Sequence, residues 1–392
     1  MNIGIEAISL FTSNQYIDLA DIATHRNLPT DKYYNALGQY QMSVPAIDED
    51  VITLAANAAA RIINDENRDS ITHVFFGTES GVDQSKSAAT YIHGLLQLSP
   101  TCRAIEIKQA CYGATAGIQM GLALIARDPS QKILVLASDV ARYGLGTDGE
   151  SSQGCGAVAI LLSANPRILS ISSESGFYTQ DIMDFWRPNY RDEALVEGLY
   201  SSRMYLQCLE KCWQMYHTKA KRDFSNYSQF CYHTPVAKLA EKAHKLLSKL
   251  NDKNINDEEA AQQLLTGLHY SRIIGNTYTG SLYVALASLL DNTQEDLSGQ
   301  RVGLFSYGSG CVAEYFSGVF VKNYQQHLFT AQHQEMLQDR SALNYEQYAK
   351  AYSAYHLPED GSSLALPKQQ TGMFRLAGIE NHKRIYESFL KL

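Results

Sequence analysis

The chain has 392 residues, 45% of them hydrophobic, and carries a formal net charge of −8. This length and composition indicate a folded globular protein with enough apolar side chains for a large core. The negative charge argues against nonspecific nucleic-acid binding, because a phosphate backbone must be met by clustered Lys and Arg.

Residues 1–8 alternate between apolar and polar side chains as a strand does, and they lack the basic and then apolar pattern of a signal sequence. The chain contains no apolar run of about eighteen residues, the length that a membrane-spanning helix needs. Seven cysteines are scattered in a pattern that predicts neither a disulfide framework nor a zinc site. We therefore expect a cytoplasmic protein that does not contact a membrane.

Strand and helix signals alternate along the chain. Short β-branched runs predict buried strands over residues 71–76, 103–107, 133–137, 157–162 and 302–306. Apolar residues at helical spacing predict helices over residues 51–64, 115–126, 238–250 and 280–290. This alternation is typical of the α/β class.

The chain is expected to divide into two α/β halves, residues 1–173 and residues 174–392. Residues 177–232 differ in character, being rich in Tyr, Trp and charge, with loop signals at Pro188 and around Asp192. We interpret this segment as an insertion that bridges the two halves.

A weak internal repeat supports the division into halves. Residues 132–137 followed by 154–159 resemble residues 301–306 followed by 308–313. Each copy reads as a strand, a glycine turn and a second strand, although glycine turns before strands also recur by chance.

Cys111 lies where the strand-like run 103–107 gives way to a helix start rich in small residues. Unpaired backbone N–H groups and the positive end of the helix dipole would lower the pKa of a thiol at that place. A lone cysteine is more often a buried structural residue. Three further polar clusters supply a carboxylate, an imidazole and an amide: Gly77-Thr78-Glu79-Ser80, Tyr232-His233-Thr234-Pro235 and Gly275-Asn276-Thr277-Tyr278-Thr279-Gly280-Ser281.

Seven motifs follow one another in order: Thr78-Glu79-Ser80, Ala110-Cys111-Tyr112-Gly113-Ala114-Thr115, Ala141-Arg142-Tyr143-Gly144, Asp184-Phe185-Trp186-Arg187-Pro188, His233-Thr234-Pro235, Gly275-Asn276-Thr277-Tyr278-Thr279-Gly280-Ser281 and Phe305-Ser306-Tyr307-Gly308-Ser309-Gly310. Together they resemble the bacterial hydroxymethylglutaryl-CoA synthase family, although any one alone would be a poor signal. The resemblance implies a thiolase-like fold of two duplicated α/β halves in αβαβα layers, as a homodimer.

The resemblance implies a Claisen-type condensation of acetyl-CoA with acetoacetyl-CoA and water. The products are 3-hydroxy-3-methylglutaryl-CoA and CoA, in the mevalonate pathway of isoprenoid biosynthesis, and no metal or cofactor takes part. Cys111 would accept the acetyl group as a thioester, and Glu79 would remove a proton from its methyl group. His233 would polarise and protonate the oxygen that becomes the tertiary alcohol.

The resemblance also assigns substrate contacts to residues that would otherwise be interpreted as surface or turn residues. The Asn276 amide would contact the substrate, and the backbone N–H of Ser309 would form an oxyanion hole with that of Cys111. Lys238 and Lys242, one helical turn apart, would hold the CoA phosphates. Further contacts with substrate or CoA are expected at Tyr143, Ser152 and Ser201. Asp184, Trp186 and Arg187 would contact the ligand or frame the pocket.

Three other functions stay open. A sibling synthase uses the same Glu, Cys and His to add acetyl from an acyl carrier protein to a polyketide β-keto thioester, but the motif at 184–188 favours the mevalonate-pathway enzyme. A ketoacyl synthase or thiolase shares the fold and the nucleophile but lacks an equivalent of Glu79. A catalytically silent interaction protein on the same scaffold is disfavoured by the intact nucleophile, base and acid.

Overall fold

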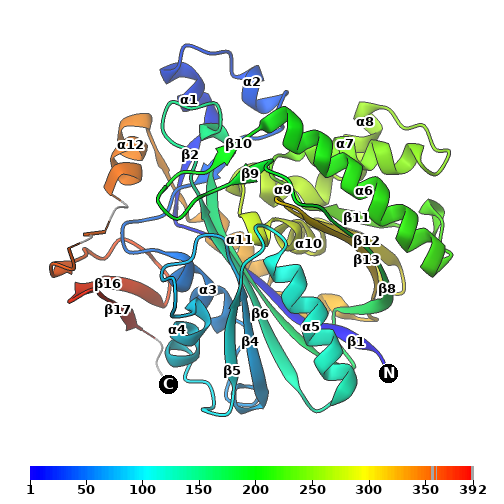
Figure 1. Ribbon diagram of the computed structural model, residues 1–392, viewed down its shortest axis with the longest axis horizontal. Helices are drawn as coiled ribbons and strands as arrows, with labels where there is room; N and C mark the ends of the chain where they lie inside the picture. Colours follow the sequence, from blue (N-terminus) through cyan, green and yellow to red (C-terminus); the bar gives the residue numbers. More distant parts are fainter. Residues whose placement is uncertain (355–356, 359, 390–392) are drawn as a thin grey trace.

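Nine strands form one mixed sheet through the middle of the molecule (Figure 1). The computed structural model describes residues 1–354, 357–358 and 360–389. Across the sheet the strands stand in the order β11-β12-β13-β8-β1-β7-β6-β4-β5. Their bounds are β1 (Ile3–Phe11), β4 (Ile71–Gly77), β5 (Arg103–Ile107), β6 (Lys132–Ala141), β7 (Gly154–Ala164), β8 (Leu169–Thr179), β11 (Gln229–Tyr232), β12 (Arg301–Gly308) and β13 (Val312–Phe320).

The sheet consists of two half-sheets joined at β1. In the first half-sheet, β4 pairs in parallel with β5 and β6, and β6 pairs antiparallel with β7. In the second, β11 pairs in parallel with β12, and β12 pairs antiparallel with β13. Strand β1 pairs with β7 along its length but meets β8 only at Gly4 and Ile5. The strand–turn–strand repeat expected from the sequence is present as the antiparallel pairs β6–β7 and β12–β13.

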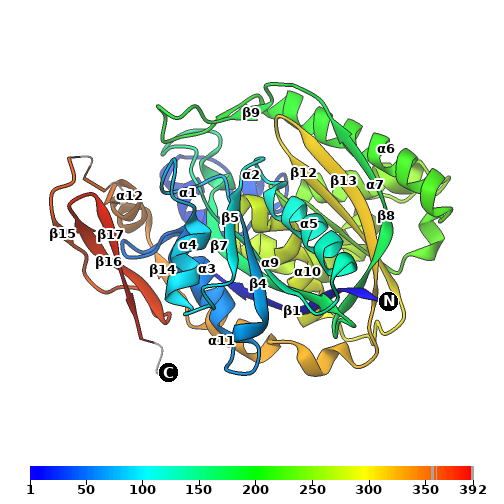
Figure 2. The ribbon, with the colours of Figure 1, turned by 60° about the horizontal axis from the view of Figure 1, so that its bottom comes forward.

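Helices lie between the half-sheets and on both outer faces (Figure 2). Helices α5 and α10 share one hydrophobic core with strands of both half-sheets, so they form the central layer. Helices α3 and α4 pack on the outer face of the first half-sheet, and α6 and α7 pack on that of the second. The five layers follow the expected αβαβα order. The helix bounds are α3 (Val51–Ala60), α4 (Ala88–Leu95), α5 (Gly113–Arg127), α6 (Gly198–Ala220), α7 (Ala237–Lys249) and α10 (Ser281–Asn292).

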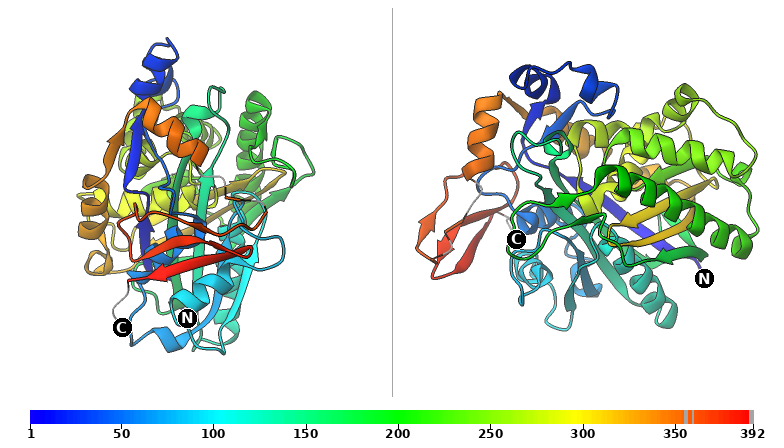
Figure 3. Two further views of the ribbon diagram at one scale, coloured as in Figure 1. Left: turned by 90° about the vertical axis from the view of Figure 1, so that its left-hand side faces the viewer. Right: turned by 45° about the horizontal axis from the view of Figure 1, so that its top comes forward.

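Smaller elements flank this framework. Figure 3 shows the C-terminal sheet of β15, β16 and β17 beside the first half, on the side of α3 and α4. Among the residues that the structure describes, no helix combines the length and the apolar character needed to cross a membrane. The remaining bounds are β2 (Gln15–Asp18), α1 (Leu19–His25), α2 (Asp31–Tyr34), β3 (Gln41–Ser43), β9 (Phe185–Trp186), β10 (Leu195–Val196), α8 (Asp257–Gln263), α9 (Leu265–Ile274), α11 (Thr330–Gln338), β14 (Ser341–Leu343), α12 (Tyr345–Ala354), β15 (Leu364–Ala365), β16 (Phe374–Glu380) and β17 (Lys383–Ser388).

All five predicted strands and all four predicted helices are present. The helix expected over 51–64 ends earlier, at Ala60, and the strands expected over 133–137 and 157–162 extend farther at both ends. The division into halves and the insertion over residues 177–232 stay predictions, and the longest element of that segment is helix α6. Helix α6 in this segment packs against β8 and β13, because its buried face completes the core of the second half-sheet.

The close packing of α6 on β8 predicts a large effect of one methyl group. A Cβ at Gly176 would lie 2.0 Å from the carbonyl oxygen of Cys212 and 2.6 Å from the backbone nitrogen of Tyr216, both in α6. Gly176→Ala should therefore lower the free energy of unfolding by about 3 kcal/mol.

Gly94→Ala is the matched control, because nothing lies within 4 Å of a Cβ there. Gly94 lies in helix α4, so Gly94→Ala should raise the free energy of unfolding by about 0.5–1 kcal/mol. Equal urea denaturation midpoints for the two variants would contradict the packing described here.

Candidate active site

The nucleophile and two of the polar clusters expected from the sequence lie at the carboxyl ends of strands in both half-sheets, and the cluster 275–281 follows α9. Glu79 comes two residues after β4, and Cys111 lies in the loop between β5 and α5. His233 follows β11 directly, and Ser309 follows β12 directly. Both strand pairs are parallel, so each pair presents its two loops at one edge of its half-sheet. That edge is where α/β proteins bind their ligands.

Cys111 and Glu79 are in direct contact. The thiol donates a hydrogen bond to Oε1 of Glu79, with 2.9 Å between sulfur and oxygen. Burial, together with the carboxylate of Asp139, raises the pKa of Glu79 to about 8. A carboxyl group whose pKa lies close to neutrality and that touches a thiol is suited to take up and return a proton.

The expected lowering of the Cys111 pKa is wrong for the resting site. The sulfur does lie at the start of α5. However, Cys111 is only 9% exposed, and the carboxylate of Glu79 lies beside it. Burial and the charge of Glu79 raise the pKa of the Cys111 thiol well above its ordinary value. Loss of water and the repulsion of like charges outweigh the partial charge of the helix end. Cys111 therefore rests as a thiol and needs a base to become a nucleophile.

Asp139, near the end of β6, holds the Glu79 loop in place. Its Oδ1 accepts hydrogen bonds from the backbone N–H groups of Glu79 (2.9 Å) and Ser80 (3.0 Å) and from the Thr78 hydroxyl (2.8 Å). Its Oδ2 accepts from the backbone N–H (3.0 Å) and the hydroxyl (2.5 Å) of Thr279, in the second half. One fully buried carboxylate thus connects the loop of the base with a loop of the other half.

His233 is buried, and its ring is oriented by a serine. The backbone N–H of Thr234 donates to Oγ of Ser281 (3.2 Å), which lies 2.6 Å from Nδ1 of His233. A hydroxyl that accepts this N–H and donates to Nδ1 leaves the proton of the neutral imidazole on Nε2. Burial lowers the pKa of His233 to about 3, so the ring is uncharged at neutral pH.

The turn after β12 packs directly against the Cys111 loop. A Cβ at Gly308 would lie 2.5 Å from the carbonyl oxygen of Gln109 and 2.6 Å from the nitrogen of Tyr112. The Gln109 amide also donates to the carbonyl oxygen of Ser309 (3.2 Å). The structure therefore brings Ser309 to the loop of Cys111, and the oxyanion hole formed by their N–H groups stays a prediction.

Asn276 is buried in the loop that follows α9. Gly275, whose φ is 88°, forms a bridge to Gly154 and so fixes this loop against the first half. Oδ1 of Asn276 accepts a hydrogen bond from the backbone N–H of Tyr278 (2.9 Å), and its side chain also hydrogen-bonds Tyr143. Asn276 thus positions two aromatic residues in addition to any contact with substrate.

Three aromatic rings surround the nucleophile. Tyr143, Phe185 and Tyr278 meet edge to face, with ring centroids 5.9, 6.1 and 5.7 Å apart. Together with Ala141 they form a small apolar cluster around Cys111. These rings exclude water from the sulfur, which is the burial that raises its pKa.

The Ser201 hydroxyl hydrogen-bonds to Asp184, whereas Ser152 lies in a short helical turn. Asp184 is fully buried and accepts hydrogen bonds from the Ser201 hydroxyl (3.0 Å), the Tyr307 hydroxyl (2.6 Å) and the Gly310 N–H (2.9 Å). Ser201 therefore belongs to a network that holds the turn after β12. Ser152 ends a short helical turn and is partly buried.

The two lysines proposed for the CoA phosphates lie on α7 in different surroundings. Nζ of Lys238 forms a 2.6 Å ion pair with Glu241, and Glu241 also pairs with Arg272 at 2.7 Å. Lys242 is exposed. The single carboxylate of Glu241 thus pairs with two cations, Lys238 and Arg272. The net charge of this group, with the exposed Lys242 beside it, stays positive.

The motifs predict no role for Asp139, and they predict only that Asp184 and Arg187 contact the ligand or frame the pocket. A signal for Asp139 was present, because an Asp inside the apolar run 132–141 has to find partners when that run is buried. Arg187 donates a hydrogen bond to the carbonyl oxygen of Glu79. Within the described part of the chain, no group of three or more His, Cys, Asp or Glu side chains is placed to hold a metal ion.

Two models of one protein family match nearly the whole chain. The model for the N-terminal part of hydroxymethylglutaryl-coenzyme A synthase matches residues 1–167. The model for the C-terminal part matches residues 170–268 and 253–386.

Individual relatives give the same result. The chain is 42% identical to hydroxymethylglutaryl-CoA synthase of Enterococcus faecalis, over 90% of this chain and 92% of that protein. It is 34% identical to a polyketide biosynthesis 3-hydroxy-3-methylglutaryl-ACP synthase of Bacillus subtilis, over 88% and 86%. A crystal structure of HMG-CoA synthase complexed with CoA superposes with a TM-score of 0.93 at 38% identity, covering 99% of this chain and all of that one. The chain therefore belongs to the hydroxymethylglutaryl-CoA synthase family of thiolase-like condensing acyltransferases.

Proposed function

We propose that the protein condenses acetyl-CoA with acetoacetyl-CoA and water to give 3-hydroxy-3-methylglutaryl-CoA and CoA, as a step of the mevalonate pathway of isoprenoid biosynthesis. The observation that carries this proposal is the 2.9 Å contact between the thiol of Cys111 and the carboxyl group of Glu79. It supplies a nucleophile and a base in one water-poor site. The higher identity to the CoA-dependent relative than to the carrier-protein relative supports CoA thioesters as the substrates.

The first step transfers the acetyl group to Cys111. Glu79 as carboxylate takes the thiol proton while Sγ attacks the acetyl-CoA carbonyl, and the departing CoA sulfur receives that proton. The N–H groups of Cys111 and Ser309 stabilise the oxygen of the tetrahedral intermediate. Glu79 is then a carboxylate again, beside an acetyl thioester on Cys111.

The second step forms the carbon–carbon bond. Glu79 removes a proton from the methyl group of acetyl-Cys111, and the resulting carbon nucleophile attacks the ketone carbon of acetoacetyl-CoA. His233, being neutral, polarises the ketone oxygen through its Nε2–H rather than transferring a proton as an imidazolium. The proton that Glu79 has taken up is available for the new alkoxide. Water then cleaves the thioester and restores the Cys111 thiol.

We further propose that the reaction requires no cofactor and that the protein acts as a cytoplasmic homodimer. All seven cysteines are free thiols, which fits a reducing compartment. Strand β5 ends the nine-stranded sheet, and its Ile105 is 46% exposed. An edge strand with an exposed apolar side chain is suited to pair with a second copy of itself. A monomeric mass by light scattering would contradict the homodimer.

The substrates are tested with acetyl-CoA and an acetylated carrier protein offered in turn, each with acetoacetyl-CoA. We expect product and free thiol to appear in a one-to-one ratio with acetyl-CoA. Turnover with the carrier protein should be at least about tenfold slower, because the carrier arm lacks the adenosine phosphates. Faster turnover with the carrier would assign the protein to polyketide biosynthesis.

Two variants separate the roles of the contacting pair. Cys111→Ser should accept no label from radiolabelled acetyl-CoA and should lose turnover by more than about a thousandfold, because an alkoxide is far less accessible than a thiolate. Glu79→Gln should still be labelled at Cys111, more slowly, but should form no condensation product. Label on any other cysteine, or condensation by Glu79→Gln near the wild-type rate, would refute these roles.

The pH dependence follows from the two pKa values. Glu79 acts as a carboxylate and its pKa is about 8, so kcat/KM should rise with pH through about 8 and then level off. His233, whose pKa is about 3, should contribute no limb between about pH 5 and pH 9. A limb near the ordinary histidine value of about 6.5 that disappears in His233→Asn would show that the imidazole is charged in the working enzyme.

The lysines of α7 are tested against a third lysine on the same helix. Lys238→Ala/Lys242→Ala should raise KM for both CoA substrates by about tenfold and leave kcat nearly unchanged, because uniform binding is lost. Lys249→Ala removes an exposed charge at the far end of α7 and should change neither constant. The double variant should also flatten the rise of KM with salt. Equal KM values for all three proteins would mean that these lysines do not meet phosphate.

A further inference from the structure

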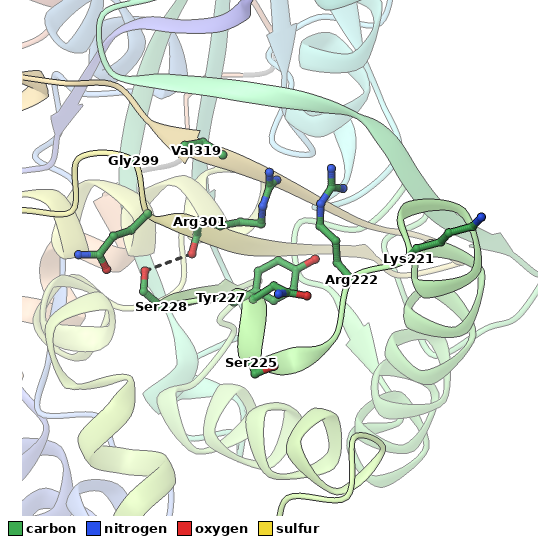
Figure 4. A pocket seen from close by; sticks show the side chains of 10 residues that line it. Lys221, Arg222, Ser225, Tyr227, Ser228, Gly299, Arg301 and Val319 are labelled. Carbon is green, nitrogen blue, oxygen red and sulfur yellow. Dashed lines mark hydrogen bonds between the residues drawn. The ribbon is translucent and has the colours of Figure 1, made fainter.

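A cavity of about 550 Å³ lies away from the active site, in the second half (Figure 4). It opens where β11 and β12 begin, whereas His233 and Ser309 stand where these strands end. Strand β12 has eight residues, so the cavity at its beginning lies about 20–25 Å from the active site at its end. A volume of this size accommodates a small metabolite. The ten lining residues are Lys221, Arg222, Ser225, Asn226, Tyr227, Ser228, Gly299, Gln300, Arg301 and Val319.

None of the lining residues is acidic, and three of them are cations from two separate parts of the chain. Lys221 and Arg222 follow the end of α6, whereas Arg301 begins β12. Figure 4 shows the side chains of Arg222 and Arg301 extending in the same direction, and both guanidinium groups lower the pKa of the nearby carboxyl group of Glu174. Glu174, which pairs with Arg222 at 3.4 Å, offsets one of the three charges. In a chain with a net charge of −8, such a local excess of positive charge requires an explanation.

Arg301 is held rigidly but keeps donors free. Its Nη1 donates to the hydroxyls of Ser172 and Ser317, at 2.7 Å each. Among the described residues, its Nε and Nη2 have no protein partner, and they reach solvent. A guanidinium fixed through one nitrogen, with its other two nitrogens open, loses little entropy when it binds an anion.

Arg222 is arranged in a similar way. The contacts of its guanidinium use Nη1, which meets the Tyr216 hydroxyl at 3.4 Å and also pairs with Glu174. Tyr216 in turn meets the hydroxyls of Tyr227 and Ser317, both at 2.8 Å. The two arginines are thus connected through one buried network of hydroxyl groups, which sets their spacing.

We propose that this cavity binds a phosphate-bearing small molecule, with Arg222 and Arg301 holding its phosphoryl group and Lys221 adding charge at the rim. Paired guanidinium donors match the geometry of phosphate oxygens. The side chains of Ser225, Asn226 and Gln300 provide neutral hydrogen-bonding groups for the rest of the molecule. The cavity and the CoA site lie at opposite ends of the strands, so both can be occupied at once.

The proposal is tested by calorimetric titration of the protein saturated with CoA, which on the function proposed above fills the phosphate sites on α7. The probes are inorganic phosphate, inorganic pyrophosphate and ribose 5-phosphate. Lys221→Gln/Arg222→Gln should weaken binding of the tightest probe at least about tenfold. The matched control, Lys211→Gln/Lys249→Gln, removes two exposed charges elsewhere and should leave binding unchanged. Ser225→Asp keeps both arginines and should also weaken binding, because it places a negative charge in the cavity.

The order of the three probes identifies the source of the phosphoryl group. Tightest binding of ribose 5-phosphate would indicate a phosphate ester whose hydroxyls meet the neutral side chains, whereas tightest binding of pyrophosphate or phosphate would indicate an inorganic anion. The proposal is overturned if none of the probes binds to the CoA-saturated wild type. It is equally overturned if the control variant weakens binding as much as the cavity variants do, or if the cavity variants bind as tightly as wild type.

Discussion

The hydrogen bond from the Cys111 thiol to Glu79 is the contact on which the rest of the site depends. With sulfur and oxygen 2.9 Å apart in a site closed off by aromatic rings, the two groups cannot both be charged. Burial raises both pKa values, so the pair rests with one proton more than two isolated groups would hold at the same pH. The nucleophile is therefore activated by proton transfer within the pair once Glu79 has lost its own proton. A standing thiolate is not needed.

Such a pair functions only if its two loops keep their places, and the two halves of the molecule secure them together. Asp139 connects the Glu79 loop to Thr279 of the second half. Gly308 packs against the backbone of the Cys111 loop so closely that no side chain fits between them. The C-terminal segment adds a further support, because Tyr348 in α12 accepts a hydrogen bond from Gln153, whose Oε1 holds the backbone of Tyr143. The duplicated fold is thus a requirement of the site, since each half supplies groups that fix the other.

Much of this could be predicted from the sequence, because the elements concerned have local signals. The strands before Glu79 and Cys111 are short apolar runs, and small residues mark the start of α5. The raised pKa of Cys111 could not be predicted, because it depends on burial and on a carboxylate 32 residues away. The packing of helix α6 could not be predicted either, because its buried aromatic side chains meet β13, which lies far from α6 in the sequence. The cavity at Arg222 and Arg301 also arises from residues far apart in the chain.

The central claim is that Cys111 rests as a thiol beside a carboxyl group of raised pKa. The most direct test is the ultraviolet difference spectrum of thiolate, wild type minus Cys111→Ser, followed from about pH 5 to about pH 9 in the absence of substrate. We expect no thiolate from Cys111 at neutral pH, and we expect the thiolate to appear at lower pH in Glu79→Gln, where the neighbouring negative charge is gone. A full thiolate signal at neutral pH in the wild type, unchanged by Glu79→Gln, would contradict it.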